Sequence, residues 1–331
     1  MRSLLLICIV GIGFLTTVLS LKICAFNVQS FGEAKANNKR VMGILTKIIS
    51  RCDLSLIQEV RDSKGKAVPA LLKNLNRFEK FNVYTHLESQ RLGKNAYKEQ
   101  YVYIYRKDVL QVQEQVYYHE LKQVEFSESE TFSREPFIIR IHSPTTFVKN
   151  FIIIGHHSCP RKAMNEMEEL FEVFQVVRNK WKTENVMLLG DLNADCGYVT
   201  IKGLKKLRLR NDPKFLWLIT DEQDTTVRDK THCAYDRIIV HGKTLISGIV
   251  PGSAQPFNFK REFSLSEQEA LEVSDHYPVE VDLNMNVQLF LVLKEDVLVL
   301  GAQLHAFETT AQIKFYSTNE EKTGSDCETK K

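Results

Sequence analysis

The stretch Val186-Met187-Leu188-Leu189-Gly190-Asp191-Leu192-Asn193 joins a short apolar run to two polar residues, Asp191 and Asn193. A run of four apolar residues that ends at a Gly-Asp turn is typical of a strand buried on both faces. In layered α/β proteins, binding and catalytic groups gather where strands end and loops begin. The stretch therefore predicts a buried strand with a candidate functional site at its end.

Seven similar apolar runs occur along the chain, and we interpret them as further strands. They are Ile23–Phe26, Leu54–Ile57, Tyr101–Tyr105, Phe137–Ile141, Phe151–Ile154, Ile238–Val240 and Val279–Leu283. Two other stretches, Val41–Ile49 and Met164–Trp181, have apolar residues at helical spacing and predict helices packed over a sheet. Because strands outnumber helices and several look hairpin-linked, packed mixed sheets with helices outside are favoured over a doubly wound single sheet.

The two ends of the chain differ from this body. Residues 1–20 hold one charge, Arg2, and an uncharged run from Leu4 to Leu15 that is too short to span ~30 Å of hydrocarbon. They predict a secretory signal peptide cleaved before Leu21, and the alternative is a buried N-terminal strand. We expect a catalytic domain at 21–284 and a C-terminal tail of unknown role at 285–331, whose apolar part is interrupted by charges and predicts no membrane span.

Charge and cysteine content narrow the possible partners and compartment. The 44 Lys and Arg against 41 Asp and Glu give a formal net charge of +3, which permits a phosphate-backbone partner without requiring one. Secretion implies an oxidising compartment, so the cysteines after the leader are candidates for disulfides. Cys24 and Cys52 are one candidate pair, while Cys159 and Cys327 are expected to be unpaired.

Polar residues also stand at the ends of five other predicted strands. They are Asn27, Gln58-Glu59, His156-His157, Asp236 and Asp275-His276. Each has a structural alternative when taken alone, because an Asn or Asp can serve a turn and a lone histidine is more often a satisfied structural residue. Together they offer hard oxygen ligands for Mg²⁺ or Ca²⁺ and bases that titrate near neutrality.

This set of groups suits phosphodiester hydrolysis. The reaction needs a general base to take a proton from water and an acid to protonate the leaving oxygen. It also needs positive charge against the developing phosphorane, which a metal ion held by carboxylates supplies. Two histidines, each oriented by a carboxylate, can be the base and the acid, and the sequence leaves open whether one ion or two are used.

Seven blocks of sequence resemble deoxyribonuclease I and its secreted paralogues, in order from Leu21 to about Leu283. The blocks are Leu21–Asn27, Ile57–Ser63, Leu92–Glu99, Ser133–Pro136, Gly190–Cys196, Cys233–Arg237 and Ser274–Glu280. The resemblance implies an α/β fold, a four-layered α/β/β/α sandwich of two mixed β-sheets flanked by helices. It also implies endonucleolytic cleavage of DNA that leaves 5′-phosphate ends.

The resemblance assigns roles to residues of the candidate site. Glu99 orients His157 and Asp236 orients His276, and these two histidines are the acid and the base. Glu59, with Asn27 and Asp275, holds one divalent ion, Mg²⁺ or Mn²⁺. Asp191 and Asn193 bind the scissile phosphate or a second ion.

The resemblance also implies partners and structural features outside that centre. DNA is contacted by four residues: Arg61, Tyr97, Arg134 and Tyr198. Cys196 and Cys233 form a structural disulfide, and Asp224 with Thr226 lies where a structural Ca²⁺ loop is expected. The chain is expected to be a secreted monomer that acts on DNA and does not associate with membranes.

This sequence departs from the family pattern at several places. Gln29 and Lys94 stand where arginines are usual, and strand alternation predicts that the Gln29 side chain faces the same side as Asn27. Residues 125–131 replace a small disulfide loop. The segment Tyr84–Ser89 carries a charge at Glu88, so tight actin binding is not expected.

Two other functions compete with a deoxyribonuclease. The same metal-phosphoesterase fold serves inositol-phosphate phosphatases, sphingomyelinases and abasic-site endonucleases, but secretion disfavours nuclear repair and the blocks around Tyr97 and Arg134 favour a DNA duplex. A non-catalytic DNA-binding or actin-binding relative would be expected to have lost a histidine or carboxylate of the site. The sequence retains all of them.

Overall fold

The computed structural model describes residues 20–79, 84–93, 97–122 and 131–286. Apart from Ser20, Met285 and Asn286, the predicted signal peptide and the predicted tail lie outside these residues, as do Lys94 and most of the 125–131 segment. In the described part of the chain, no helix is long and apolar enough to cross a membrane.

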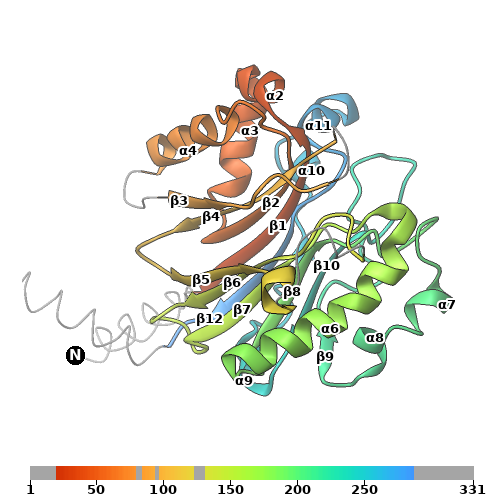
Figure 1. Ribbon diagram of the computed structural model, residues 1–331. Helices are drawn as coiled ribbons and strands as arrows, with labels where there is room; N and C mark the ends of the chain where they lie inside the picture. Colours follow the sequence, from red (N-terminus) through yellow and green to blue (C-terminus); the bar gives the residue numbers. More distant parts are fainter. Residues whose placement is uncertain (1–19, 80–83, 94–96, 123–130, 287–331) are drawn as a thin grey trace, which may run out of the picture. The chain divides into compact units, whose positions relative to one another are not determined.

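Two six-stranded mixed sheets form the centre of the fold (Figure 1). In the first sheet β1 and β2 are parallel and the other neighbours are antiparallel. Its strand order is β11 (Gln255–Pro256), β12 (Val279–Asn284), β1 (Ser20–Phe31), β2 (Leu54–Val60), β4 (Gln100–Arg106) and β3 (Tyr84–Glu88).

The second sheet repeats this plan with β7 and β8 as its parallel pair. Its strand order is β5 (Gln111–Tyr117), β6 (Phe137–His142), β7 (Asn150–Gly155), β8 (Val186–Asp191), β10 (Asp236–His241) and β9 (Phe215–Trp217). All eight apolar runs of the sequence lie in these strands, which confirms the predicted mixed sheets.

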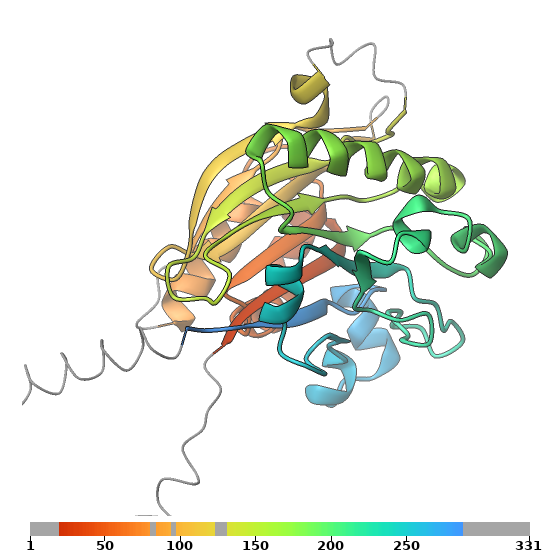
Figure 2. The same ribbon diagram turned by 90° about the horizontal axis from the view of Figure 1, so that it is seen from below.

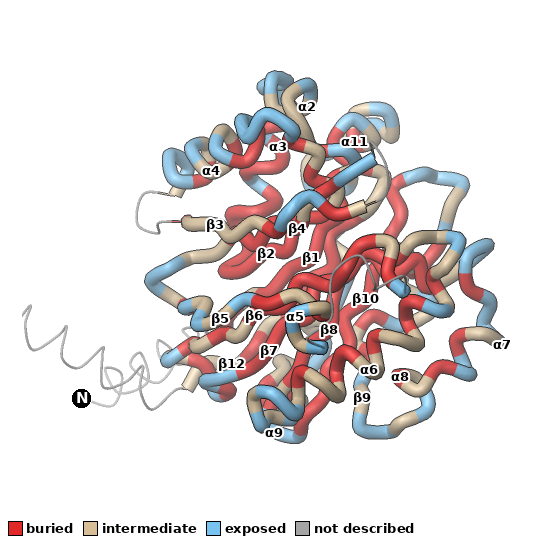
Figure 3. Tube along the Cα trace, viewed as in Figure 1, coloured by how far each residue is buried: buried red, intermediate tan, exposed pale blue. Residues whose placement is uncertain are grey.

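The two sheets pack face to face through alternate residues of their strands. Leu21, Ile23 and Ala25 of β1 point into the core between the sheets, while Phe26 and Val28 belong to the core beneath the helices. Strand side chains alternate between faces, so strands buried on both sides read as continuous apolar runs. Figure 3 shows these central strands as the most buried part of the fold.

Helices cover the outer face of each sheet. The first is covered by α3 (Lys39–Ile49), α4 (Ala67–Phe78) and α11 (Glu267–Val273), and the second by α6 (Ala163–Trp181) (Figure 2). Short helices complete the fold: α2 (Glu33–Asn37), α5 (Tyr118–Lys122), η2 (Pro160–Lys162), α7 (Ile201–Leu204), α8 (Arg208–Asn211), α9 (Lys243–Gly248) and α10 (Phe259–Glu262). This arrangement is the four-layered sandwich predicted above.

Two disulfides lie within this body. Cys24 of β1 is bonded to Cys52, just before β2, and Cys196 is bonded to Cys233 across 37 residues. Cys159 is free and partly exposed, as expected, and Cys327 lies outside the described residues.

We expect that replacing Cys196 and Cys233 together by serine lowers the free energy of unfolding by ~2 to 4 kcal/mol, because the crosslink restricts the unfolded chain. Denaturant unfolding monitored by intrinsic fluorescence measures the change. Cys159→Ser is the matched control and should leave the midpoint nearly unchanged. Equal midpoints for the double variant and the wild type would contradict the prediction.

Candidate active site

The parallel strand pairs bring the predicted polar residues to one edge of the sandwich. Asn27 pairs with Gln58 where the parallel stretch of β1 and β2 ends. Asp191, the last residue of β8, is directly opposite Asp236, the first residue of the antiparallel β10. His157 follows β7 by two residues, and His276 precedes β12. Polar side chains from both sheets therefore meet at the same place.

Irregular backbone at this edge redirects the side chains. Gln29 and Ser30 have φ of 46° and 57°, and Glu59 has φ of 56°, a left-handed conformation that non-glycine residues seldom adopt. The Asn27 Oδ1 accepts a hydrogen bond from the Gln29 backbone N–H at 2.9 Å, and Glu59 Oε2 accepts one from the Ser30 backbone N–H at 3.0 Å. Because β1 is irregular between Asn27 and Phe31, the alternation used to place Gln29 on the side of Asn27 does not apply there.

Lys35 supports this irregular segment. Its ammonium donates hydrogen bonds to the backbone oxygens of Val28, Gln29 and Val273, at 2.8, 2.6 and 2.8 Å. Burial lowers the pKa of Lys35 to about 8, although Asp275 and Glu59 oppose the shift. The lysine thereby joins the end of β1 to the C-terminal end of α11, just before His276.

The first histidine pair consists of His157 and Glu99, both buried. His157 Nδ1 lies 2.6 Å from Glu99 Oε1, and its Nε2 lies 3.4 Å from Asp191 Oδ2. The guanidinium of Arg134 holds this pair in place, because its Nε donates to the His157 backbone oxygen at 3.0 Å and lies 3.2 Å from Glu99 Oε1. The Glu99 carboxylate fixes the imidazole so that Nε2 faces the centre of the site.

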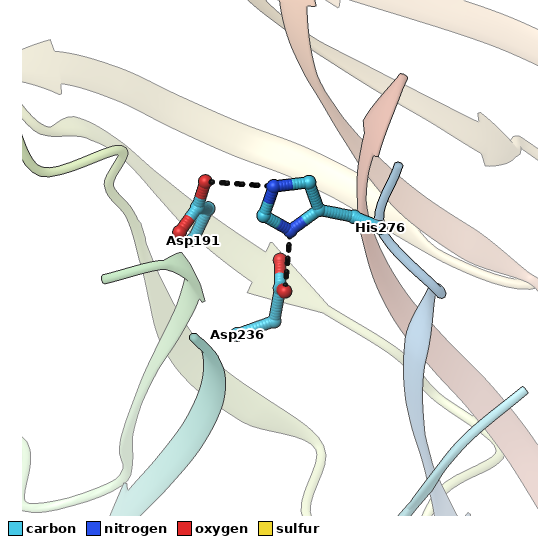
Figure 4. A group of neighbouring side chains, drawn as sticks. All are labelled: Asp191, Asp236 and His276. Atoms are coloured by element: carbon cyan, nitrogen blue, oxygen red, sulfur yellow. Dashed lines mark hydrogen bonds and ion pairs between the residues drawn. The ribbon is translucent and has the colours of Figure 1, made fainter. Parts of the chain in front are cut away.

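The second histidine pair consists of His276 and Asp236, and it lies on the other side of the Asp191 carboxylate. His276 Nδ1 lies 2.7 Å from Asp236 Oδ2, and its Nε2 lies 3.6 Å from Asp191 Oδ2 (Figure 4). The His276 side chain is 12% exposed and Asp236 is fully buried. Two imidazoles, each with a carboxylate behind it, therefore point their Nε2 atoms at one oxygen of Asp191.

Burial and charge set the protonation of these groups. Burial and Arg134 lower the pKa of His157, but Glu99 and Asp191 outweigh them and raise it above the usual range. Burial also opposes the charged form of His276, yet Asp236 and Asp191 raise its pKa well above the usual range. Burial works against ionised Asp191 too, but the two histidines and the Asn27 amide lower its pKa. The site therefore holds an ionised aspartate between two histidines that readily carry a proton.

Two of the carboxylates predicted to bind metal or phosphate, Glu59 and Asp191, face the same point beside Asn27. The Asn27 Nδ2 donates to Glu59 Oε1 and to Asp191 Oδ2, each at 3.0 Å, so two carboxylates point at the same amide nitrogen. Carboxylate and amide oxygens are the ligands that Mg²⁺ and Mn²⁺ prefer. Asp275 lies close enough for its charge to raise the pKa of both Lys35 and His276. This donor set fits a hard divalent ion.

A second grouping of possible metal ligands fits less well. One ligand atom each of Asp191, Asp236 and His276 lie within 4.8 Å of one another (Figure 4). Both nitrogens of His276 already face carboxylate oxygens, so this histidine is arranged for proton transfer rather than for holding a metal. The Glu59 side of Asp191 is therefore the better candidate for holding a metal ion.

The remaining predicted residues have distinct surroundings. The Asn193 amide donates to the Ser158 backbone oxygen at 3.1 Å, and its backbone N–H donates to Asp191 Oδ1.

The four residues predicted to contact DNA differ in exposure. The Arg61 guanidinium lies over the ring of Tyr97, 4.1 Å from its centroid, and Tyr97 and Tyr198 are about half exposed. By contrast Arg134, also predicted to contact DNA, is only 9% exposed and is engaged with Glu99 and His157. The structure thus gives Arg134 a positioning role besides any contact with substrate.

The predicted Ca²⁺ loop supports the second histidine pair. Asp224 Oδ1 accepts hydrogen bonds from the Thr226 backbone N–H and hydroxyl, at 2.9 and 2.6 Å. Thr226 is bridged to His276, and Thr225 Oγ1 accepts a hydrogen bond from the Asp236 backbone N–H at 3.2 Å. Asp224 and Thr226 therefore stabilise the segment that presents Asp236 and His276.

Three residues to which the sequence analysis assigned no role complete the site, and one of them, Gln58, was noted only as a polar residue at a strand end. The Gln58 amide donates to the His156 backbone oxygen at 2.7 Å and accepts from the Asp191 N–H at 3.0 Å. The Glu166 carboxylate, fully buried, accepts hydrogen bonds from the Ser133 and Cys159 N–H groups. Lys35 is the third. Gln58 could have been assigned a role from the sequence, because a polar residue inside an apolar strand is unusual. Lys35 and Glu166 could not, because lysine and glutamate are common in helices with an exposed face.

Comparison with known proteins agrees with this geometry. The model of the Endonuclease/Exonuclease/phosphatase family matches residues 24–276. The chain belongs to this family. Deoxyribonuclease gamma of Homo sapiens is 44% identical over 268 residues, covering 81% of the chain and 87% of the relative. Deoxyribonuclease-1 of Sus scrofa is 47% identical over 271 residues, covering 82% and 94%. The predicted resemblance to the deoxyribonuclease I family is confirmed.

Solved structures share the fold at low sequence identity. The catalytic domain of human Nocturnin superposes with a TM-score of 0.56 at 13% identity and covers 81% of the chain and 95% of that structure. An endonuclease/exonuclease/phosphatase family protein from Leptotrichia buccalis gives the same TM-score at 16% identity, covering 80% and 99%. These likenesses support the sandwich fold alone.

We predict that Glu99→Gln moves one limb of the pH–activity profile to lower pH, because removal of the carboxylate lowers the pKa of His157. A shift of the low-pH limb would assign His157 as the base, and a shift of the high-pH limb would assign it as the acid. Asp236→Asn is the matched variant and should move the other limb. The prediction is wrong if Glu99→Gln lowers turnover while both limbs stay in place.

Proposed function

We propose that this chain is a secreted, divalent-metal-dependent endonuclease that hydrolyses DNA phosphodiester bonds and leaves 5′-phosphate ends. The observation that carries the proposal is the pair of histidine–carboxylate couples, His157–Glu99 and His276–Asp236, directed at one side of Asp191. The names of the relatives support DNA as the substrate, and the partly exposed Arg61 with the exposed Tyr97 and Tyr198 offers cationic and aromatic contacts to a nucleic acid.

The geometry suits acid–base catalysis at phosphorus. One Nε2 accepts a proton from the attacking water while the other donates a proton to the leaving 3′ oxygen, so the phosphate stays on the 5′ side. Glu99 and Asp236 stabilise whichever imidazole is protonated. Bound near Glu59, Asn27 and Asp275, Mg²⁺ or Mn²⁺ would supply positive charge to the phosphate oxygens. Asn193 lies beside Asp191, where its side chain can help to orient the phosphate.

Further properties of the chain belong to the same proposal. We place the mature protein outside the cell as a monomer, with the first 20 residues acting as a signal peptide. Ca²⁺ bound near Asp224 and Thr226 would stabilise the loop that supports His276. On β3, an edge strand of the first sheet, His86 Nε2 and Glu88 Oε1 are 3.0 Å apart. This charged edge favours weak or absent actin binding.

We expect His157→Ala and His276→Ala each to reduce turnover by ~100-fold or more without unfolding, because general acid–base catalysis typically contributes 10² to 10⁴. Initial rates of supercoiled-plasmid nicking measure the loss, and thermal unfolding confirms that each variant is folded. His142→Ala, at a partly exposed histidine of β6 away from the candidate site, is the control. Near-normal turnover by either active-site variant would remove that histidine from the mechanism.

We expect nicking to require Mg²⁺ or Mn²⁺, to stop with chelator and to return when the ion is restored, because the carboxylates alone give the phosphorane no positive charge. End-labelling of the products tests for 5′-phosphate. Glu59→Gln should raise the Mg²⁺ concentration needed for half-maximal rate by ~10-fold or more, a loss typical of metal-site changes. Full activity in chelator would overturn metal dependence, and hydrolysis of inositol phosphates or sphingomyelin without nicking would favour the other family activities.

A further inference from the structure

Three lysines near α7 form an exposed basic patch that the site described above does not include. Lys202, Lys205 and Lys206 are exposed and are called the α7 lysines here. We infer that these lysines extend the DNA-binding surface beyond Tyr198 and contact backbone phosphates away from the scissile bond. This inference rests on the proposed function, because it assumes that the substrate is a duplex long enough to reach them.

The segment that carries the α7 lysines is firmly attached to the body. The Cys196–Cys233 disulfide fixes its start, and Val199, Leu204 and Leu207 are buried in the core beneath α6. A side chain at Gly203 would come within 3.1 Å of the Met164 sulfur, so the helix packs closely against the start of α6. The lysines therefore project from an ordered backbone, which needs no further ordering on binding.

The charge of this segment is not neutralised locally. Residues 196–211 contain no Asp or Glu, although the whole chain has 41. Farther along, Arg208 is paired with Glu168 and Glu172, and Arg210 with Asp221. None of the α7 lysines forms an ion pair with another described residue. Unpaired lysines on one surface are typical of a phosphate-backbone contact.

A row of aromatic rings links this segment to the catalytic centre. The Tyr198 ring lies 5.3 Å from that of Tyr235, which lies 6.1 Å from the His276 ring. Lys202 is four residues beyond Tyr198, and a chain of four residues spans at most ~14 Å. Figure 1 shows α7 in the connection that leaves β8. A duplex bound at His276 and Tyr198 would therefore continue toward the α7 lysines.

The test replaces Lys202, Lys205 and Lys206 by glutamine in the full chain. We expect the Michaelis constant for a 30-base-pair duplex to rise about tenfold while turnover at saturation stays within about twofold. The log–log salt slope of duplex binding, measured by fluorescence anisotropy with the His157→Ala substitution added to prevent cleavage, should become shallower by about 2 to 3 units, since each neutralised phosphate contributes ~0.9.

The matched control replaces Lys182, Lys214 and Lys243 by glutamine. These three exposed lysines line a pocket at the opposite ends of β8 and β10, so the variant loses the same charge away from the active site. An unchanged slope in the α7 variant, or an equal change in both variants, would overturn the inference. Binding to anionic phospholipid vesicles that is lost in the α7 variant, with unchanged DNA binding, would assign the patch to a membrane instead. Failure of the wild type to nick DNA would overturn the proposed function itself.

Discussion

The buried amide of Gln58 is the constraint on which the site depends. It belongs to β2 of the first sheet, yet both of its hydrogen bonds go to the second sheet, at the His156 oxygen and the Asp191 N–H. A fully buried amide is costly unless its donor and acceptor are both satisfied, so this residue favours one relative position of the two strand ends. Gly190 makes the approach possible: with φ of 135°, it lies where a Cβ would come within 2.2 Å of the His156 oxygen.

Once the sheets are fixed in this way, the charges of the site stabilise one another. Asp191 is ionised in a buried position because two imidazoles and the Asn27 amide face it, and the imidazoles carry a proton readily because Asp191 is there. Removing either histidine leaves the buried Asp191 carboxylate with less opposing charge, which lowers the stability of this part of the fold. Arg134 belongs to this balance, since Glu99 would otherwise lie beside Asp191 with only His157 to oppose it. The interactions that position these candidate catalytic groups are therefore also the interactions that stabilise this part of the fold.

Much of the fold could be predicted from the sequence because its strands are buried on both faces. Such strands appear as short apolar runs, and Phe151–Ile154 and Ile238–Val240 are uninterrupted examples. The polar residues at their ends could be found for the same reason, since each interrupts an apolar pattern. The placement of Gln29 could not be predicted, because period-two alternation holds only in a regular strand and β1 is irregular after Asn27. The burial of Arg134 could not be predicted either, because it depends on Glu99, just before β4, and on His157, just after β7.

Residues with a left-handed backbone conformation are concentrated around the candidate active site. Of the residues with positive φ, Gln29, Ser30, Glu59 and Asn193 all adjoin the cluster around Asp191. Each is held there by a hydrogen bond to a site residue or by Lys35, so the fold maintains these conformations instead of relaxing them. The groups that face solvent are different in kind: Tyr97 and Tyr198 are half exposed and rest on Arg61 and Tyr235. For the proposed hydrolysis of DNA this division is useful, because a rigid centre would fix the reacting phosphate while exposed aromatic and cationic side chains contact the rest of the duplex.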